Sequence, residues 1–531
     1  MRIHQNLAND FPSYFGVLFA KFYGGHSLGW RKRHPFAILE KMKSYEDYYI
    51  KKRNSLSDEK FRFRVVGALK KDLAIHISAV CGKAMASIAC MLKEVGYVVT
   101  GSDLSFHPPM SDVLTFHDIK CLKPSIENLK NIGLFIPGNM LPSSDMEVAF
   151  AREKNISMMS GAEVLGELLT KNKRSLVVAG THGKTTSSSL LVHLFLTADR
   201  NPAYLIGGVF RDSEKSYSMG DNKSSHVIFE GDEYDCAYFD KAPKFLRYNP
   251  TSAIITSIEH DHIDLYKTFE DYKQAFQFLV EDIPREGYML IHQSTLSSLD
   301  ISKCEGNVFV YGPSAKDIQY KIQETNSSGT IFSVKIKEKL YNDIFIPLFG
   351  EYNVSNATAV FALAFLEGLD LESIYIGLKT YPGTHERQEV LGIKNGNITI
   401  VRDFAHHPTA VGVTLEGLRL QYPNHRLICV FEPRSITSRR KIFEKEYPKV
   451  LSLADVSIVS TPPFRPGDNT ENFMDISVVQ KELQSMKKEI YLADNSENVL
   501  SILAENIKEN DIIVFMSNGD FGNIANLFLK S

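Results

Sequence analysis

Cysteine, tryptophan and long apolar runs are all scarce in this chain. Its 531 residues include six cysteines, none of them in a CxxC pair, and a single tryptophan, Trp30. Scattered thiols are typical of a reducing compartment, so we expect a cytoplasmic protein. No uncharged apolar run approaches the ~18 residues that a membrane helix needs, and the apolar stretch 11–20 follows Asp10 without a clear cleavage site. The sequence therefore predicts no membrane insertion.

A strong net charge is also missing. The formal charge is −3, with 44% hydrophobic and 23% charged residues, which excludes a collagen-like, coiled-coil or wholly disordered chain. Residues 1–70 are an exception, with 14 Lys or Arg against 6 Asp or Glu. Such a basic segment can contact nucleic acid or membranes. A solvated extension is the simpler interpretation, and we expect no nucleic-acid partner.

From residue 73 onward, short apolar runs alternate with helical stretches. This is the pattern of β–α units around parallel sheets, and the length suggests three or four domains. A polar stretch at 170–174 and the turn Tyr381-Pro382-Gly383-Thr384 are suitable boundaries. We predict an α/β protein with a basic extension at 1–72 followed by domains at 73–173, 174–381 and 382–531.

The segment GTHGKTT at 180–186 carries the strongest local signal. It follows the apolar run 175–179 and precedes a helical stretch, so its backbone N–H groups can cradle phosphates. In such a loop Lys184 reaches the β- and γ-phosphates and Thr185 ligates Mg²⁺. The loop departs from the standard Walker pattern, because Val178 occupies the position of its first glycine.

Acidic residues and a histidine follow two further predicted strands. The run EGDEYD at 230–235 comes after an apolar strand, and SIEHDHID at 257–264 comes after another. Gathering carboxylates at a strand end is costly unless a cation compensates. Ligands of open α/β folds bind at the carboxyl edge of the sheet, so we expect Thr185, Glu230 and His262 to hold a divalent metal there.

Three other segments are candidates for binding. Residues 75–85 form a strand–turn–helix with one glycine, Gly82, equally compatible with nucleotide binding and with an ordinary turn. Asp103, after the next strand, suits a ribose or base. Asn353 and Asn356 open a later helix, and DFAHHPTA at 403–410 pairs a carboxylate with two imidazoles.

Read in order, these motifs resemble the Mur ligases, which join amino acids or peptides to UDP-N-acetylmuramate with ATP. The resemblance covers about 73–531 and rests on GTHGKTT, IEHDHID (258–264), GEYNVSNATA (350–359) and DFAHHPTA. Within the family, the chain is most similar to murein peptide ligases, on stretches such as HPPMSDVL (107–114), FEPRS (431–435) and SNGDFG (517–522).

The resemblance implies a fold and a set of site residues. The fold is an N-terminal Rossmann-like UDP-binding domain, a central P-loop ATPase domain and a C-terminal Rossmann-like domain. The implied ATP-binding residues are Gly180, Thr181, His182, Gly183, Lys184, Thr185, Thr186, Asn353, Asn356, Arg387 and Asp403. The implied metal ligands are Thr185, Glu230 and His262. The residues implied to bind the UDP substrate are Gly82, Lys83, Ser102 and Asp103. The residues implied to bind the peptide are Arg434, Ser435 and Asn518.

The implied reaction is ATP-dependent and proceeds with Mg²⁺ through an acyl phosphate. It joins the tripeptide L-alanyl-γ-D-glutamyl-meso-diaminopimelate to UDP-N-acetylmuramate, with Lys184 and either His406 or His407 as catalytic residues. One alternative is a ligase that adds free L-alanine, and another is a nucleotide-binding scaffold without catalysis. Ser257, Tyr352, Glu386 and Asp520 depart from the family's usual residues.

Overall fold

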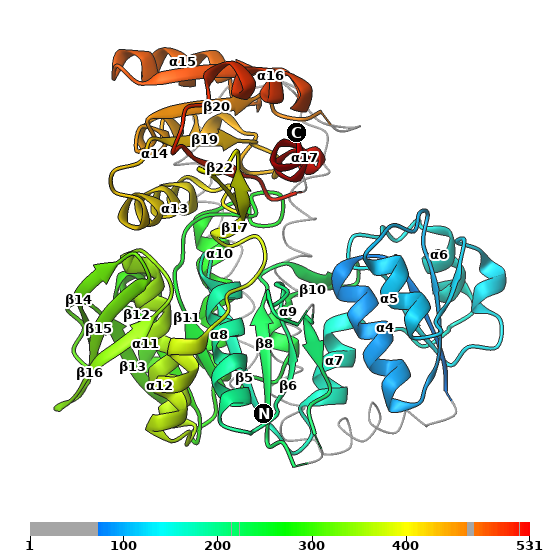
Figure 1. Cartoon of the computed structure of the whole chain (residues 1–531). Coiled ribbons are helices and arrows are strands. Elements are labelled where there is room, and N and C mark those ends of the chain that lie inside the picture. Colours follow the sequence, from blue (N-terminus) through cyan, green and yellow to red (C-terminus); the bar gives the residue numbers. More distant parts are fainter. Residues whose placement is uncertain (1–72, 214, 222, 465–471, 520) are drawn as a thin grey trace, which may run out of the picture. The chain divides into compact units, whose positions relative to one another are not determined.

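A computed structural model describes residues 73–531 except 214, 222, 465–471 and 520. The extension predicted at 1–72 lies outside the described residues, as does Asp520. The rest of the chain forms parallel sheets covered by helices (Figure 1). The predicted α/β class is confirmed.

The first sheet has four parallel strands in the order β3-β2-β1-β4. The strands are β1 (Ala74–Ser78), β2 (Val98–Ser102), β3 (Lys120–Leu122) and β4 (Leu134–Ile136). Its helices are α4 (Lys83–Val95), α5 (Met110–Phe116), α6 (Met146–Glu153) and α7 (Gly161–Leu169). α4 ends at Gly96, whose φ of 101° closes the helix in the left-handed region that glycine tolerates.

The second sheet has ten strands in the order β16-β15-β14-β13-β12-β11-β5-β8-β6-β7. They are β5 (Arg174–Ala179), β6 (Ala203–Leu205), β7 (Tyr217–Ser218), β8 (His226–Gly231), β11 (Ser252–Ile255), β12 (Tyr288–His292), β13 (Asn307–Gly312), β14 (Ile318–Asn326), β15 (Gly329–Ile336) and β16 (Lys339–Ile346). β14 to β16 pair antiparallel. A separate hairpin joins β9 (Asp235–Ala237) and β10 (Asp240–Pro243).

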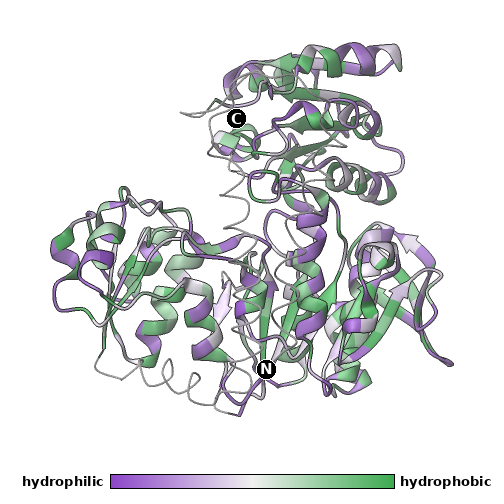
Figure 2. Cartoon of the chain, turned by 180° about the vertical axis from the view of Figure 1, so that it is seen from behind, coloured by the Kyte–Doolittle hydropathy of each residue, from purple (hydrophilic) through white to green (hydrophobic). Residues whose placement is uncertain are grey.

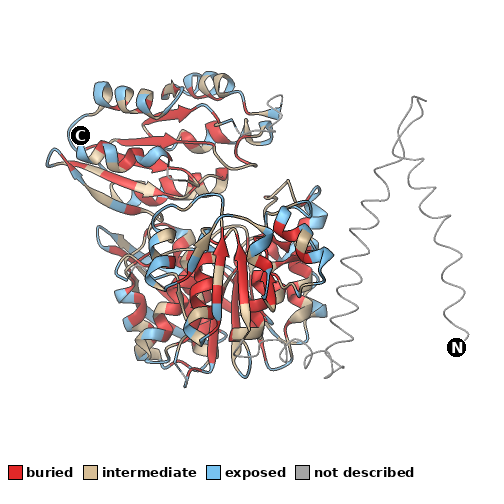
Figure 3. Ribbon diagram, turned by 90° about the vertical axis from the view of Figure 1, so that its right-hand side faces the viewer, coloured by how far each residue is buried: buried red, intermediate tan, exposed pale blue. Residues whose placement is uncertain are grey.

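Helices cover this sheet and bury its centre. They are α8 (Lys184–Thr197), α9 (Lys244–Arg247), α10 (Phe269–Asp282), α11 (Glu351–Leu366) and α12 (Leu371–Thr380). Leu190, Phe195 and Phe361 belong to one core with the strand residues Leu176 and Ile228. The central strands β5, β8 and β11 are buried along almost their whole length, as the hydrophobic colouring of Figure 2 and the burial colouring of Figure 3 illustrate for the centre of the sheet. This burial explains why their sequences read as continuous apolar runs.

The third sheet has the order β17-β18-β22-β19-β20-β21, and only β17 runs antiparallel. Its strands are β17 (Glu389–Lys394), β18 (Ile398–Asp403), β19 (Leu427–Phe431), β20 (Val456–Ser460), β21 (Glu489–Ala493) and β22 (Ile512–Met516). The helices are α13 (Pro408–Gln421), α14 (Tyr447–Leu451), α15 (Ile476–Ser485), α16 (Ser496–Asn506) and α17 (Ile524–Lys530). Val514 and Phe515 enter separate cores on opposite faces, so helices cover both sides.

The composition led us to expect neither membrane-spanning helices nor disulfide bonds. None of the helices in the described ranges is long and apolar enough to cross a membrane. All six cysteines are free thiols.

A buried carboxylate ties the start of β5 to the end of α11. The side chain of Glu367 is 1% exposed; Arg174 Nη2 donates to its Oε1 at 2.9 Å, and His226 Nε2 lies 3.4 Å from its Oε2. Burial acts to raise the pKa of Glu367, but its bonds with His226, Arg174 and Ser252 outweigh this and lower the pKa from 4.5 to about 2.

We therefore expect Glu367→Gln to lower the free energy of unfolding at pH 7 by about 3 kcal/mol. This contribution is complete above the unfolded pKa near 4.5 and is lost as the pH falls toward about 2. Urea titrations between pH 7 and pH 2 measure it, with the exposed Glu372→Gln as control. Equal stability of Glu367→Gln and wild type at pH 7 would contradict this role.

Candidate active site

Three neighbouring parallel strands bring the predicted motifs together. β5 lies between β8 and β11, so the segments that follow these strands meet at one edge of the sheet. They are the loop 180–186, the acidic run 230–235 and the segment 256–264. This is the carboxyl edge that open α/β folds use for ligands.

Glycines and hydrogen bonds fix the shape of the loop. Gly180 has φ 132° and Gly183 has φ 80°, and a Cβ on Gly183 would lie 2.6 Å from Asn356 Oδ1. The N–H of His182 donates to Ser257 Oγ at 2.9 Å, and that of Thr181 donates to the Ser257 carbonyl at 3.0 Å. Ser257, a departure from the family pattern, therefore supports the loop directly.

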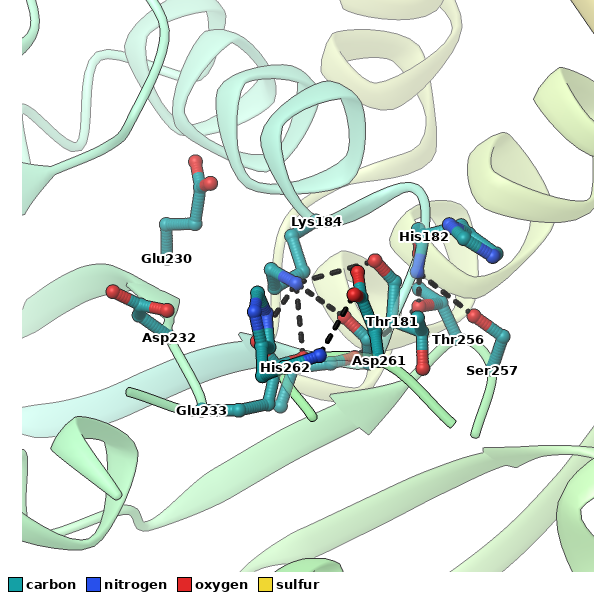
Figure 4. Close-up of polar contacts among 12 residues, drawn as sticks. Thr181, His182, Lys184, Glu230, Asp232, Glu233, Thr256, Ser257, Asp261 and His262 are labelled. Carbon is teal, nitrogen blue, oxygen red and sulfur yellow. Dashed lines mark hydrogen bonds and ion pairs between the residues drawn. The ribbon is translucent and has the colours of Figure 1, made fainter. Parts of the chain in front are cut away.

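Lys184, the first residue of α8, is held by a buried carboxylate. Its Nζ donates to both oxygens of Glu233 at 2.9 Å and to the Gly180 carbonyl at 2.6 Å. Glu233 is fully buried, and Figure 4 shows the pair beside His262. Burial acts to lower the pKa of Lys184, but the charges of Glu233 and Asp232 outweigh it and raise the pKa. Lys184 is therefore a fixed positive charge in the loop.

The four carboxylates of the acidic run are compensated separately. Each has a different partner. Glu233 binds Lys184, Asp232 binds Lys244, Asp235 binds Lys241 and Glu230 accepts a hydrogen bond from Thr185. Lysine side chains thus compensate three of these charges.

Glu230 and Thr185 fit the predicted magnesium site. Thr185 Oγ1 donates to Glu230 Oε1 at 2.8 Å, and the N–H of Gly207 donates to Oε2 at 2.7 Å. Oxygen ligands of this kind suit Mg²⁺. His262 Nε2 lies 3.7 Å from Glu233 Oε2 instead, and Figure 4 shows Glu230 apart from it. The structure therefore joins two of the three predicted ligands.

Glu230→Gln is expected to raise the Mg²⁺ concentration for half-maximal activity about 10- to 100-fold, because it removes an anionic oxygen beside Thr185. A smaller shift is expected for His262→Ala. Initial rates over a Mg²⁺ titration measure both, with Asp235→Asn from the same acidic run as control. Unchanged titration curves for both variants would remove the metal assignment.

A cavity of ≈ 270 Å³ lies beside the loop. Its lining includes Lys184, Glu230 and His262, together with Arg387 and Asp403 from beyond the turn at 381–384. Arg387 Nη2 donates to Thr185 Oγ1 at 3.1 Å, and its guanidinium carbon lies 4.6 Å from the centre of the Phe404 ring. A second cationic side chain thus reaches the predicted phosphate site.

Asp403 shapes the cavity wall through backbone contacts. Its Oδ2 accepts from the N–H of Gln388 and its Oδ1 from that of Ala405, both at 2.7 Å. Burial raises the pKa of Asp403 despite the Arg387 charge. These bonds fix the segments that carry Arg387 and His406.

His406 and His407 both line the cavity but have different surroundings. His406 Nδ1 donates to the Phe404 carbonyl at 3.0 Å, leaving Nε2 as an acceptor. His407 caps α13 by accepting from the N–H of Thr409. Burial is the main cause that lowers the pKa of each imidazole, that of His407 to about 4.

The two predicted asparagines lie on the first turns of α11. Asn353 lines the cavity, and its Nδ2 donates to the Phe349 carbonyl at 2.8 Å. Asn356 packs against Gly183 of the loop. Tyr352, where the family usually has histidine, also lines the cavity.

The predicted UDP-side residues differ in exposure: three lie around the start of α4, and Ser102 is buried in β2. Asp103 Oδ2 accepts from the N–H of Cys81 at 2.9 Å, Gly82 caps α4, and Lys83 is exposed. Ser102 is fully buried and donates to Glu147 Oε2 at 2.6 Å. The Ser102 hydroxyl is thus engaged within its own domain, and a UDP-side role for this residue stays a prediction.

The predicted peptide residues lie at the ends of two paired strands. β19 and β22 run parallel with Phe431 opposite Met516, so Arg434 and Asn518 follow neighbouring strand ends. A Cβ on Gly519 would lie 2.6 Å from Arg434 Nε. Arg434 Nη1 lies 3.8 Å from Glu432 Oε1, whereas Ser435 Oγ accepts from the N–H of Ser438 and closes a local turn.

Two carboxylates and an arginine have site roles that the sequence did not reveal. Glu233 holds Lys184, and Glu259 Oε2 lies 3.3 Å from His182 Nε2 and accepts from Thr409 Oγ1 at 2.6 Å. Arg211 donates to the carbonyls of Thr384 and Arg387 and anchors the connecting segment. Glu233 and Glu259 lie inside recognised motifs, but Arg211 has no local signal.

Family models match most of the chain. The Mur ligase family catalytic domain matches residues 74–173, the Mur ligase middle domain matches 178–364, and the Mur ligase glutamate ligase domain matches 386–519. A UDP-N-acetylmuramate–L-alanine ligase of Clostridium acetobutylicum is 30% identical over 87% of this chain and 99% of its own length. The corresponding ligase of Clostridium tetani is 29% identical over the same shares.

Solved structures agree with this assignment. A murein peptide ligase of Psychrobacter arcticus has a TM-score of 0.63 and 26% identity, over 86% of this chain and 98% of that one. A UDP-N-acetylmuramate–alanine ligase of Thermotoga maritima, 21% identical over the same shares, has a TM-score of 0.70 and supports the fold. The chain therefore belongs to the Mur ligase family and is an ATP-dependent amide ligase with that family's three-domain architecture.

Proposed function

We propose that this ligase joins the lactyl carboxylate of UDP-N-acetylmuramate to the amine of the tripeptide L-alanyl-γ-D-glutamyl-meso-diaminopimelate. In this proposal, residues 73–173 form the domain that binds the UDP substrate, residues 174–381 the domain that binds ATP, and residues 382–531 the domain that binds the peptide. The proposal also includes a cytoplasmic location, expected from the free thiols.

In the proposed reaction, a carboxylate oxygen attacks the γ-phosphorus of ATP and ADP leaves. The amine then attacks the acyl carbon, phosphate departs with that oxygen, and the amide remains. Lys184 and Arg387 stabilise the charge on the transferred phosphoryl group. Mg²⁺, held by Thr185 and Glu230 with His262, supplies further charge neutralisation when bound.

A base must accept a proton from the attacking amine. His406 is the better candidate, because its Nε2 remains an acceptor while its Nδ1 binds the Phe404 carbonyl. His407 Nδ1 instead caps α13 by accepting from the N–H of Thr409.

The observation that carries the tripeptide assignment is the position of Arg434. It lies against Gly519 at neighbouring strand ends of the third sheet, with Asn518 next to that glycine in sequence. A guanidinium binds a carboxylate bidentately, and the tripeptide brings several carboxylates. Buried Glu432, which accepts from Ser517 Oγ, lies within ion-pairing distance of the arginine, at 3.8 Å from its Nη1.

Addition of free L-alanine is the second candidate. It is favoured by the names of the two clostridial relatives, whose lengths this chain covers almost fully. Both candidates share the ATP site and the UDP-N-acetylmuramate substrate, so only the acceptor separates them.

The test is to incubate the full chain with ATP, Mg²⁺ and UDP-N-acetylmuramate plus tripeptide, L-alanine or no acceptor. Mass spectrometry of the product and ADP release are followed together. We expect one ADP for each tripeptide amide formed. An alanyl product formed at equal or higher kcat/KM would select the L-alanine ligase, and no turnover with either acceptor would reject both candidate acceptors.

A further inference from the structure

Two imidazoles and a carboxylate converge next to the cavity. This cluster does not include Glu230, the predicted magnesium ligand. Its three residues are His182 in the loop, Glu259 after β11 and His407 at the start of α13. One potential ligand atom from each lies within 4.8 Å of the other two. We propose that His182, Glu259 and His407 form a binding site for a divalent transition-metal ion of the Zn²⁺ class.

The distances fit such an ion. Bonds of 2.0–2.1 Å in a tetrahedron place neighbouring ligand atoms about 3.3–3.4 Å apart. His182 Nε2 lies 3.3 Å from Glu259 Oε2, and His407 Nδ1 lies 3.7 Å from the same oxygen. Two edges of the ligand triangle thus have nearly the required length. The third edge joins the two imidazoles, whose ring centres are 4.7 Å apart and whose ligand atoms lie within 4.8 Å of each other.

Hydrogen bonds already join the residues of this cluster. His407 Nδ1 accepts from the N–H of Thr409 at 3.3 Å, and His182 Nε2 is hydrogen-bonded to Glu259 Oε2 at 3.3 Å. An imidazole nitrogen has one lone pair, so an ion bound through His407 Nδ1 would replace the bond to Thr409. Thr409 Oγ1 donates to Glu259 Oε2 at 2.6 Å and fixes the carboxylate in this orientation.

The ligand set distinguishes this ion from magnesium. Imidazole nitrogens suit Zn²⁺, Co²⁺ and Ni²⁺, whereas Mg²⁺ prefers oxygen ligands such as Thr185 and Glu230. Three protein ligands leave a fourth position open. His182 and His407 line the cavity, and the ion would connect the loop to the start of α13.

The experiment is calorimetric titration of the full, nucleotide-free chain with ZnCl₂ in excess Mg²⁺. We expect one Zn²⁺ per chain and a higher thermal unfolding temperature, because the ion binds the native state. Affinity should fall at least tenfold in His182→Asn, Glu259→Gln and His407→Asn. Asparagine preserves the capping function at 407, so that variant is expected to fold.

Two control variants locate the ion. Glu230→Gln removes a predicted magnesium ligand, and Cys81→Ser removes a partly exposed thiol. Unchanged stoichiometry in both, with loss in the ligand variants, supports the site. Zn²⁺ binding that depends on Glu230 or Cys81 and survives Glu259→Gln would overturn it, as would absence of binding. Co²⁺ bound without a thiolate charge-transfer band would support the nitrogen and oxygen ligand set.

Discussion

Replacing Lys184 with methionine is expected to lower kcat/KM for amide formation about 100- to 1,000-fold. Its ammonium lies in the loop, within hydrogen-bonding distance of Gly180 and Glu233, where it would meet the phosphates of ATP. Removing one pre-oriented donor to transition-state charge typically costs this much. Steady-state ADP release measures the effect, and near-wild-type turnover by a folded Lys184→Met variant would contradict the assignment.

The same substitution also tests the role of Glu233. Without Lys184 this fully buried carboxylate loses its ion-pair partner, and breaking such a pair costs about 3–5 kcal/mol of stability. The double variant Lys184→Met/Glu233→Gln should recover most of that stability and remain inactive. If the double variant is no more stable than Lys184→Met, the pair does not contribute as described.

The second large effect concerns the amine acceptor. We expect kcat/KM for the tripeptide to exceed that for L-alanine at least a hundredfold, because the shorter acceptor leaves buried polar groups unpaired. Each such group costs roughly 1–3 kcal/mol, and two or three losses suffice. Competition between the two acceptors at fixed ATP and UDP-N-acetylmuramate measures the ratio.

Arg434→Ala should lower the ratio of kcat/KM for the tripeptide to that for L-alanine, and it should leave the KM for ATP nearly unchanged. The reason is that Arg434 is placed in the proposed peptide site. Arg434→Lys should recover only part of the ratio, since an ammonium lacks the bidentate geometry. Arg419→Ala is the matched control, because Arg419 pairs with Asp455 in the same domain. Unchanged acceptor preference in Arg434→Ala would remove this residue from the peptide site while leaving the ligase assignment intact.

Local patterns predicted the elements that carry the nucleotide loop. The apolar run before Gly180 forms β5, and the helix that follows Gly183 begins at Lys184. Strand β22 has the same character, because Ile512 to Met516 is wholly apolar and buried on both faces. Such runs are specified by their own composition, since helices cover both sides of these sheets.

Partner choice within the site could not be predicted in the same way. The sequence shows four carboxylates at 230–235, but only the fold shows that Lys241 and Lys244 neutralise two of them. Ser102 follows the same logic, because its partner Glu147 is 45 residues away in sequence. Arg211 reaches Arg387 across 176 positions. Long-range pairing of this kind leaves no periodic trace.

The most direct test of the account uses UDP-N-acetylmuramate labelled with ¹⁸O in its lactyl carboxylate. With ATP, Mg²⁺ and tripeptide, the account predicts one ADP per amide and one ¹⁸O atom transferred into each inorganic phosphate, because the carboxylate oxygen leaves with the phosphoryl group. Amide formation with unlabelled phosphate, or with AMP and pyrophosphate as products, would contradict acyl-phosphate chemistry in this site.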